Sequence, residues 1–136
     1  MIKKETDQIE CIKLLLVDDE EGYINVLSKR LARRNICVTS ALKVSDAIHI
    51  LRDNDFNVAI LDLKMEDMDG IEALKIFKRL CPPIEVIMLT GHGSEQAARD
   101  GLSLGAFAYL TKPCDLDDLL NKIRQAARRK GGGTGG

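Results

Sequence analysis

Acidic, hydroxyl and amine side chains stand close behind four short apolar runs of the chain. Asp18 and Asp19 follow the first run, and Asp62 follows the third. Thr90 follows the fourth run, and Lys112 comes shortly after the fifth. If the fold brings these positions together, they supply the carboxylates, the hydroxyl and the ammonium that transfer of a phosphoryl group to a side chain requires.

The carboxylates carry the chemistry of such a cluster. Three neighbouring carboxylates repel one another, so at least one pKa would be raised without a counter-ion. A hard divalent cation with oxygen ligands and open water positions resolves this repulsion, which indicates Mg²⁺, with Mn²⁺ as a substitute. Asp62 is best placed to attack phosphorus and form an acyl phosphate, with Asp18 and Asp19 as the metal pair. Lys112 can then pair with one phosphoryl oxygen, while Thr90 and the backbone N–H groups after Asp62 reach another.

Each signal has an ordinary structural explanation when it is taken alone. The run Asp18 to Glu21 is typical of a solvated helix start, and one aspartate after a strand is usually a turn residue. Thr-Gly and Lys-Pro pairs are also common in turns. The joint occurrence of all of them at strand ends favours a site over turn chemistry.

Short apolar runs alternate with amphipathic stretches five times, which predicts a parallel sheet with helices on both faces. Runs one, three and four are almost wholly apolar, as strands buried on both faces are, and run two is mixed, as in an edge strand. The expected fold class is α/β, a doubly wound five-stranded parallel sheet of flavodoxin-like order 2-1-3-4-5. Ligands of such sheets bind at the carboxyl ends of the strands, near the switch point between strands one and three. The expected strands are 14–17, 36–39, 58–61, 86–89 and 107–110, and the helical faces lie within 23–31, 44–51, 71–77, 97–102 and 116–127.

Length and composition are those of one ordinary domain. The chain has 136 residues, a formal net charge of -1, 4% aromatic residues and no Trp, so we expect no direct nucleic acid binding by this segment. No apolar run is long enough to cross a bilayer, and the polar N-terminus lacks a signal peptide's apolar core, so a cytoplasmic location is expected without membrane insertion. We expect a flexible leader over 1–11, the domain over 12–130, and a glycine-rich linker or added tail over 131–136.

The cysteines are scattered and form no CxxC pair. Cys11, Cys37, Cys81 and Cys114 are expected to be reduced structural or surface thiols rather than a metal site or a disulfide framework.

Four segments of the chain carry a family resemblance. LLLVDDEE, AILDLKMEDMDG, VIMLTGHGS and GAFAYLTKP occur in this order between Lys13 and Arg129. Together they resemble the response-regulator receiver domain of two-component signal transduction, and in particular the receivers of bacterial transcriptional regulators.

The resemblance implies a role for each residue of the acidic site. Asp62 matches the phosphoacceptor, and Asp18 and Asp19 match the Mg²⁺-binding pair, with Asp19 as the direct ligand. The backbone carbonyl of Lys64 would complete the metal ligands. Thr90 matches the switch hydroxyl that moves toward the phosphoryl group.

The resemblance also assigns the fifth strand and the residues after it. Tyr109 matches the switch aromatic, whose ring swings between exposed and buried positions. Lys112 matches the lysine that pairs with the phosphate, and its bond to Pro113 would be cis, as cis bonds are essentially a proline feature.

A phosphoacceptor switch follows from these matches. Asp62 would take a phosphoryl group from a partner histidine kinase or phosphotransfer protein. Thr90 and Tyr109 would then alter the surface of the fourth helix, fifth strand and fifth helix, which is a plausible homodimer face. Such a receiver phosphorylates and dephosphorylates itself, so we expect no enzyme with an external substrate.

The chain departs from the family pattern at three places. Glu66 stands where the family often has Pro, from which we expect a looser loop without loss of a catalytic atom. Cys114 stands where Phe is common, and Gly91 leaves room beside the switch threonine. His92 is expected to be an exposed loop histidine.

Three other hypotheses remain at this stage. An aspartyl phosphatase or phosphotransferase would place a second acid two residues after its nucleophile, where this chain has Lys64. A flavodoxin-like cofactor binder needs a phosphate-cradling loop after the first strand, where Asp18 and Asp19 would repel phosphate. The third is the receiver portion of a longer transcription factor or hybrid kinase whose output domain is absent here.

Overall fold

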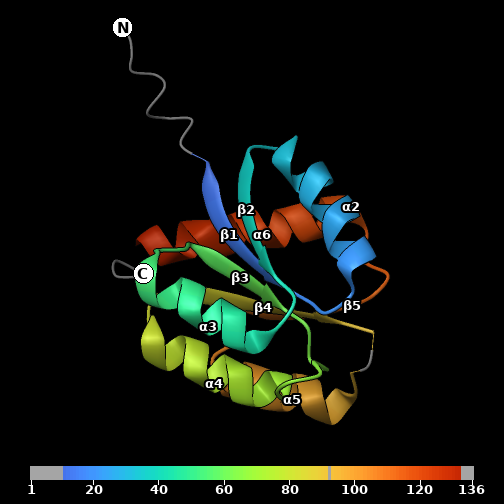
Figure 1. Cartoon of the computed structure of the whole chain (residues 1–136), viewed down its shortest axis with the longest axis vertical. Helices are drawn as coiled ribbons and strands as arrows, with labels where there is room; N and C mark the ends of the chain where they lie inside the picture. Colours follow the sequence, from blue (N-terminus) through green and yellow to red (C-terminus); the bar gives the residue numbers. More distant parts are fainter. Residues whose placement is uncertain (1–10, 92, 133–136) are drawn as a thin grey trace, which may run out of the picture.

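The computed structural model describes residues 11–91 and 93–132. Five strands alternate with five helices along this part of the chain, as the sequence predicts (Figure 1). The elements, in chain order, are β1 (Ile12–Val17), α2 (Glu21–Ala32), β2 (Ile36–Ala41), α3 (Val44–Asp53), β3 (Val58–Leu61), α4 (Gly70–Leu80), β4 (Glu85–Thr90), α5 (Glu95–Ser103), β5 (Ala108–Thr111) and α6 (Leu116–Gly132).

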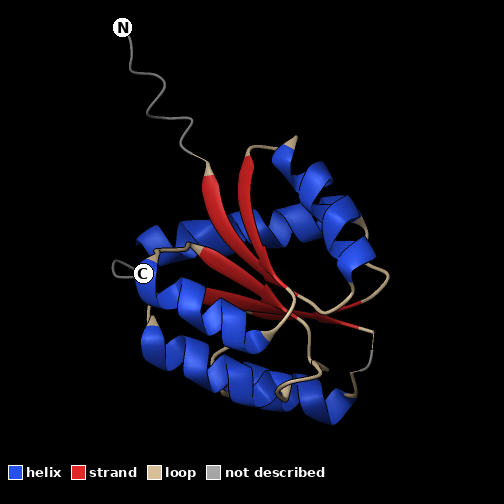
Figure 2. Cartoon of the chain, in the orientation of Figure 1, coloured by secondary structure: helices blue, strands red, loops and turns tan. Residues whose placement is uncertain are grey.

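The strands form one parallel sheet in the order β2-β1-β3-β4-β5, which confirms the predicted topology. Figure 2 shows the sheet between two layers of helices. Helices α3, α4 and α5 cover one face, and α2 and α6 cover the other. All five strands therefore end at the same edge of the sheet, where the chemically active side chains were expected.

Two hydrophobic layers hold the helices on the sheet. Every residue of β3 is buried, and β1 and β4 are buried except at their amino ends, because helices cover both faces of these strands. In β2, buried and exposed residues are mixed, as expected for the predicted edge strand. Residues at the centre of the layer under α3 and α4 include Leu15, Leu61, Leu74, Phe77 and Met88. Those under α2 and α6 include Leu14, Leu31, Ile60, Ile87 and Ile123.

The ends of the chain fall partly outside the described residues. Residues 1–10 of the expected leader, residues 133–136 of the expected tail and His92 lie outside them. α6 includes Gly131 and Gly132, so the last helix reaches two residues into the glycine-rich segment. Within the part of the chain that the structure describes, no helix has the length and apolar character needed to span a bilayer.

The expectation of four reduced thiols is wrong for one pair, because Cys11 and Cys37 form a disulfide with a Cα–Cα distance of 5.9 Å. The two cysteines are 26 residues apart in sequence, so no local pattern reveals the pairing. They meet because β1 and β2 are parallel neighbours in which Lys13 lies opposite Cys37. Cys81 and Cys114 are free thiols and partly buried.

Gly70 allows α4 to begin against the loop that follows β3. Its amide donates a hydrogen bond to the Leu63 carbonyl at 2.7 Å. A Cβ at this position would lie 2.6 Å from the Leu63 Cα and 2.8 Å from the Asp62 carbonyl oxygen, closer than backbone atoms tolerate.

We predict that Gly70→Ala lowers the free energy of unfolding by roughly 1–3 kcal/mol, because backbone atoms must move to admit the methyl group. Gly22→Ala is the matched control, since nothing lies within 4 Å of a Cβ there and the residue is helical. That control should keep or gain stability, by up to about 1 kcal/mol. Urea unfolding of both variants checks the difference, and equal stability would contradict the packing described for Gly70.

Candidate functional site

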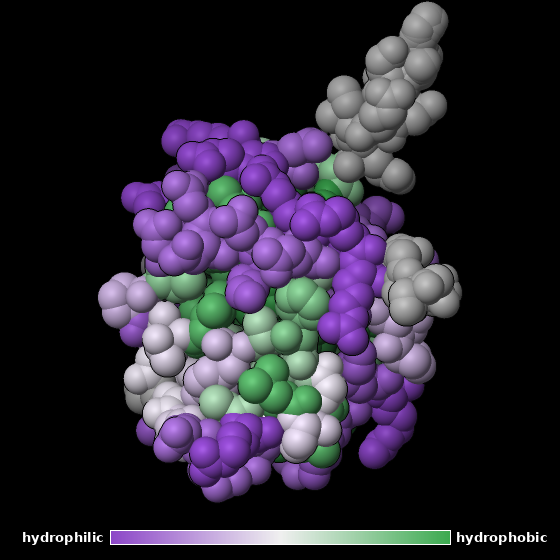
Figure 3. Space-filling model, turned by 180° about the vertical axis from the view of Figure 1, so that it is seen from behind, coloured by the Kyte–Doolittle hydropathy of each residue, from purple (hydrophilic) through white to green (hydrophobic). Residues whose placement is uncertain are grey.

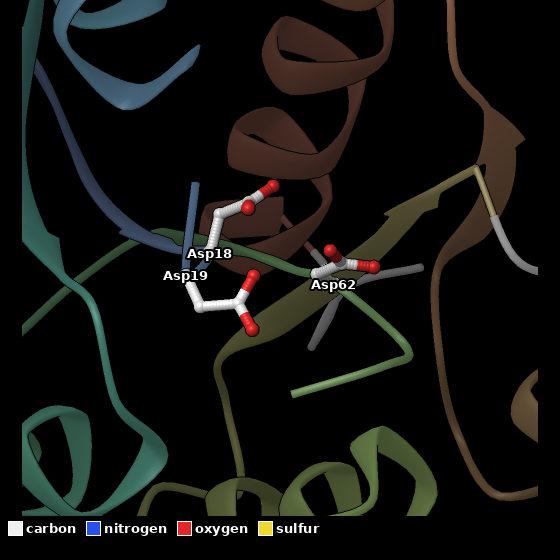
Figure 4. Close-up of side chains that lie close together, drawn as sticks. All are labelled: Asp18, Asp19 and Asp62. Atoms are coloured by element: carbon white, nitrogen blue, oxygen red, sulfur yellow. The ribbon is translucent and has the colours of Figure 1, made fainter. Parts of the chain in front are cut away.

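Three aspartates meet where β1 and β3 end. Asp18, Asp19 and Asp62 each offer a carboxylate oxygen, and these oxygens lie within 4.8 Å of one another (Figure 4). Asp18 and Asp62 are 2% and 3% exposed. The structure thus brings together the three acids that the sequence singled out.

Backbone hydrogen bonds fix the two buried acids just beyond the strands. The Asp18 amide donates to the Ala41 carbonyl at 3.2 Å, and the Asp62 amide donates to the Val17 carbonyl at 3.1 Å. These bonds continue the ladders that join β1 to β2 and β3 to β1, so the sheet itself sets the spacing of the carboxylates. The amides of Glu20 and Lys64 donate to the carboxylates of Asp18 and Asp62 at 2.9 and 3.3 Å, and so orient them.

The ammonium of Lys112 lies among the acids. Its Nζ is 2.7 Å from Asp18 Oδ2, 2.8 Å from Glu20 Oε1 and 3.6 Å from Asp62 Oδ2. The same nitrogen lies 4.3 Å from the centre of the Tyr23 ring. Burial works against the charge of this ammonium, but the hydrogen bonds to Asp18 and Glu20 outweigh it and hold the Lys112 pKa above its usual range.

One ammonium does not fully compensate these carboxylates. Burial raises the pKa of Asp18 above its ordinary value, even though hydrogen bonds from Lys112 and the Glu20 amide lower it. The neighbouring charge of Asp62 adds to the rise. A buried carboxylate that costs free energy to ionise, beside two further carboxylates, suits a hard divalent cation with oxygen ligands. The donor set therefore fits a hard divalent cation.

A pocket of about 290 Å³ opens beside the acids, between the end of β1 and the loop after β3. Its lining includes Lys64, whose carbonyl was the expected fourth metal ligand. The residues that line it are Asp19, Glu20, Asp62, Lys64, Met65 and Glu66.

Thr90 and Lys112 are held together at the ends of β4 and β5. Thr90 is the last residue of β4 and is fully buried. The amide of Lys112 donates to the Thr90 carbonyl at 2.9 Å, and Thr90 pairs with Thr111 across the two strands. The peptide bond between Lys112 and Pro113 is cis, as the resemblance implied.

Tyr109 is turned inward beneath the loop after β4. The ring is partly buried and packs on the hydrophobic layer under α3 and α4. Its hydroxyl oxygen is buried, and the Ser94 backbone lies near enough to influence it. Burial raises the pKa of this hydroxyl above that of a free tyrosine.

Asp67 anchors the loop that carries Lys64. Its two carboxylate oxygens accept hydrogen bonds from the amides of Val44 and Ser45, both at 3.0 Å. These are the first residues of α3, whose own N-cap residue, Lys43, makes no side-chain cap. The carboxylate of Asp67 therefore caps a helix 22 residues earlier in the chain and ties the loop to it.

The sequence interpretation missed three residues of this neighbourhood. The sequence showed Glu20 only as part of an acidic run. Its pairing with Lys112 could not be predicted without knowing where β5 lies in the sheet. Tyr23 was assigned to a helical face, and its contact with Lys112 is also long-range. Asp67 gave no signal at all, since its partners belong to another helix.

The comparison with known families agrees with this site. The profile of the response regulator receiver domain matches residues 14–124. The chain belongs to the response regulator receiver domain family of two-component systems.

Individual relatives support the same family. The transcriptional regulatory protein GlrR of Escherichia coli (strain K12) is 34% identical over 121 residues, which cover 89% of this chain and 27% of GlrR. The chain spans about a quarter of the length of this curated relative.

Solved receiver domains share the fold. The beryllofluoride-activated NtrC4 receiver domain dimer has a TM-score of 0.83 and 31% identity, over 87% of this chain and 98% of that chain. A response regulator protein from Burkholderia pseudomallei with a phosphorylated aspartic acid, calcium ion and citrate has a TM-score of 0.79 and 25% identity, over 87% of this chain and 69% of that chain.

We predict that Asp67→Ala lowers the free energy of unfolding by about 1 kcal/mol, the usual loss for a removed N-cap. Asp67→Asn keeps one acceptor oxygen and should lose less. Burial weakly opposes the charge of Asp67, but the amides of Ser45 and Val44 hold its pKa below the ordinary value. A depressed carboxyl pKa stabilises the fold above the unfolded pKa, and this contribution is lost as the pH falls through the folded pKa.

The pH dependence of unfolding distinguishes the contribution of the Asp67 charge to stability from that of the side chain's shape. The stability difference between the wild type and Asp67→Asn should therefore shrink below about pH 4. Urea titrations at neutral and acidic pH measure it, and Glu66→Ala, next in the chain, is the control. If Asp67→Ala and Glu66→Ala were equally stable at neutral pH, the capping role would be wrong.

Proposed function

We propose that this domain is a phosphoacceptor switch in which Asp62 receives a phosphoryl group from a histidine kinase or a phosphotransfer protein. The observation that carries the proposal is the placement of the Lys112 ammonium, 3.6 Å from Asp62 and 2.7 Å from Asp18, inside a cluster of three carboxylates. A positive charge held beside a buried carboxylate at the mouth of a pocket suits a site that must accept added negative charge.

The reaction at Asp62 replaces one phosphorus bond by another. A carboxylate oxygen of Asp62 attacks the phosphorus, the bond from phosphorus to the donor's imidazole nitrogen breaks, and the electron pair leaves with that nitrogen. The product is an acyl phosphate on Asp62. Asp18, Asp19, Asp62 and the Lys64 carbonyl would hold a divalent cation, which would supply positive charge for the phosphoryl oxygens.

The residues around Asp62 receive the new phosphoryl group. Lys112 reaches a phosphoryl oxygen with a small movement, because its ammonium already lies near Asp62. The Thr90 hydroxyl comes from the adjacent strand end and donates to another oxygen. The Burkholderia pseudomallei neighbour carries a phosphorylated aspartic acid in the same fold, which supports the assignment.

The domain acts on itself rather than on an external substrate in this proposal. Lys64 occupies the position two residues after Asp62 at which an aspartyl phosphatase would hold a second acid. The partners are then macromolecular phosphodonors, and a cytoplasmic location is part of the same proposal.

The alternative is that the chain is the receiver portion of a longer regulator. It is favoured by one observation, that matched residues cover 27% of GlrR, a transcriptional regulatory protein. Both versions keep the same chemistry at Asp62, and they differ only in what the switched surface contacts.

That surface is formed by α5, β5 and α6 in our proposal. Thr90 and Tyr109 connect it to the acidic site, since both border the loop between β4 and α5. Leu102 and Leu104, near the end of α5, are 47% and 40% exposed. Figure 3 shows the molecule from behind the view of Figure 1. Hydrophobic residues gather in the middle of the face seen there, between hydrophilic borders. The NtrC4 neighbour is a dimer of beryllofluoride-activated receivers, which supports a homodimer here.

We predict that incubation with acetyl phosphate and Mg²⁺ adds the mass of one phosphoryl group to the chain. Asp62→Asn should take up none, and Lys112→Ala should react at least ~10-fold more slowly because the phosphoryl oxygens lose a paired cation. Intact mass spectrometry over time measures both.

Chelation and a folded control complete this experiment. Removal of Mg²⁺ with EDTA should stop the uptake, and reaction at an unchanged rate would contradict the metal assignment. Circular dichroism should show Asp62→Asn to be folded. An adduct that persists in Asp62→Asn would overturn the assignment of the acceptor.

We predict that beryllofluoride with Mg²⁺ converts the domain from monomer to dimer. Leu102→Glu places a charge on the proposed face and should raise the dimer dissociation constant at least ~10-fold. Val26→Glu, at a residue 54% exposed on α2, is the matched control and should dimerise as the wild type does. Sedimentation analysis distinguishes these outcomes, and equal weakening by both variants would refute this choice of face.

A further inference from the structure

We propose that Cys11 and Cys37 form a reversible redox site that exchanges with a small anionic disulfide and the thiol it yields on reduction. The proposal is independent of the phosphoacceptor function and rests on the placement of the two cysteines. Cys11 immediately precedes β1, and Cys37 is the second residue of β2. Their Cα–Cα distance of 5.9 Å lies inside the range of roughly 4.4–6.8 Å that a disulfide spans without backbone movement.

The bond is accessible from solvent. Cys37 is exposed on the edge strand and Cys11 is half-buried. Ile36 and Val38, its neighbours in β2, pack under α2 and α6, so alternation turns the Cys37 side chain to the other face of the sheet. There it borders a pocket of about 350 Å³. Small thiols and disulfides can therefore reach the sulfur.

Basic residues line the pockets beside the pair. Cys11 borders a second pocket, of about 430 Å³, whose lining includes Lys13, Arg124 and Arg128. Lys13 also lines the pocket beside Cys37, and Asp55 is the acidic residue that both pockets share. Cations near a thiol favour the reactive thiolate, and they also attract a disulfide that carries carboxylates, such as that of glutathione.

The other two cysteines lack this environment. Cys114 is partly buried, and burial together with Asp118 and Asp115 raises the pKa of its thiol. Cys81 lies at the end of α4 without a cysteine partner. Exchange should therefore select Cys11 and Cys37.

The exchange proceeds in two balanced steps. A Cys37 thiolate attacks one sulfur of the small disulfide, forming a mixed disulfide and releasing one small thiol. The Cys11 thiolate then attacks the Cys37 sulfur, closing the protein disulfide and releasing the second small thiol. Both cysteines are oxidised, and the small disulfide is reduced by two electrons. An excess of the small thiol reverses both steps.

The consequence is a redox-dependent stability of the domain. The disulfide closes a loop that contains α2 and the acids Asp18 and Asp19, and it ties the edge strand β2 to β1. Cross-linking lowers the conformational entropy of the unfolded chain, so the oxidised form is the more stable one. The acidic site lies at the opposite end of β1 and does not contact the bond.

The test uses the full chain in buffers of reduced and oxidised glutathione. After equilibration, free thiols are alkylated, the intact mass is measured, and peptide mapping locates the bond. We expect one disulfide between Cys11 and Cys37 that forms and reduces reversibly across the glutathione series. Oxidation should raise Tm by roughly 5–15 °C.

Variants separate this pair from the other thiols. Cys37→Ser and Cys11→Ser should each abolish both the bond and the redox dependence of Tm, whereas Cys81→Ser and Cys114→Ser should keep both. The proposal is overturned if another pair forms the bond. It is equally overturned if millimolar glutathione cannot reduce the bond, or if the wild type melts at one temperature in both redox states.

Discussion

The ammonium of Lys112 is the interaction on which the functional end of the molecule depends. Its Nζ lies within 4 Å of carboxylate oxygens of Asp18 and Asp62, both of which are almost completely buried. A buried carboxylate is costly unless a partner compensates it, so a positive charge lowers the cost of placing these two acids side by side at the strand ends. Lys112 comes from the far edge of the sheet, and its backbone is held there by Thr90. The strand order therefore brings a compensating charge to the acids as well as packing the core.

The loop between β3 and α4 depends on a second set of constraints. Glu66 replaces the proline that family members often have there, and the loop is held by other means. Asp67 ties it to α3, Asp69 caps α4 through the Ile71 amide at 2.7 Å, and the missing side chain of Gly70 lets α4 start against the loop backbone. Because Lys64 lies between Asp62 and these anchors, the position of its carbonyl is set by neighbours on two helices.

Much of the fold and the core of the site could be predicted from the sequence because both depend on local patterns. Apolar runs such as 58–61 mark buried strands, and the rule that parallel strands end at one edge brings Asp18, Asp62, Thr90 and Lys112 together. What escaped prediction depends on contacts between distant segments. The pairing of Cys11 with Cys37 follows from the register of two strands, and the cap that Asp67 provides follows from the packing of a loop on α3. Neither contact produces a periodic pattern in the sequence.

In the proposed switch, the inward position of Tyr109 would link the acidic site to the surface of α5, β5 and α6 by steric exclusion. A Cβ at Gly93 would overlap the Tyr109 hydroxyl and lie 3.2 Å from the Thr90 methyl group. The ring therefore occupies space that any side chain at position 93 would fill, and it touches the loop that begins at Thr90. In the proposed switch, a movement of Thr90 toward a phosphoryl group would change the shape of this space, and the ring would have to move because the surrounding core is close-packed.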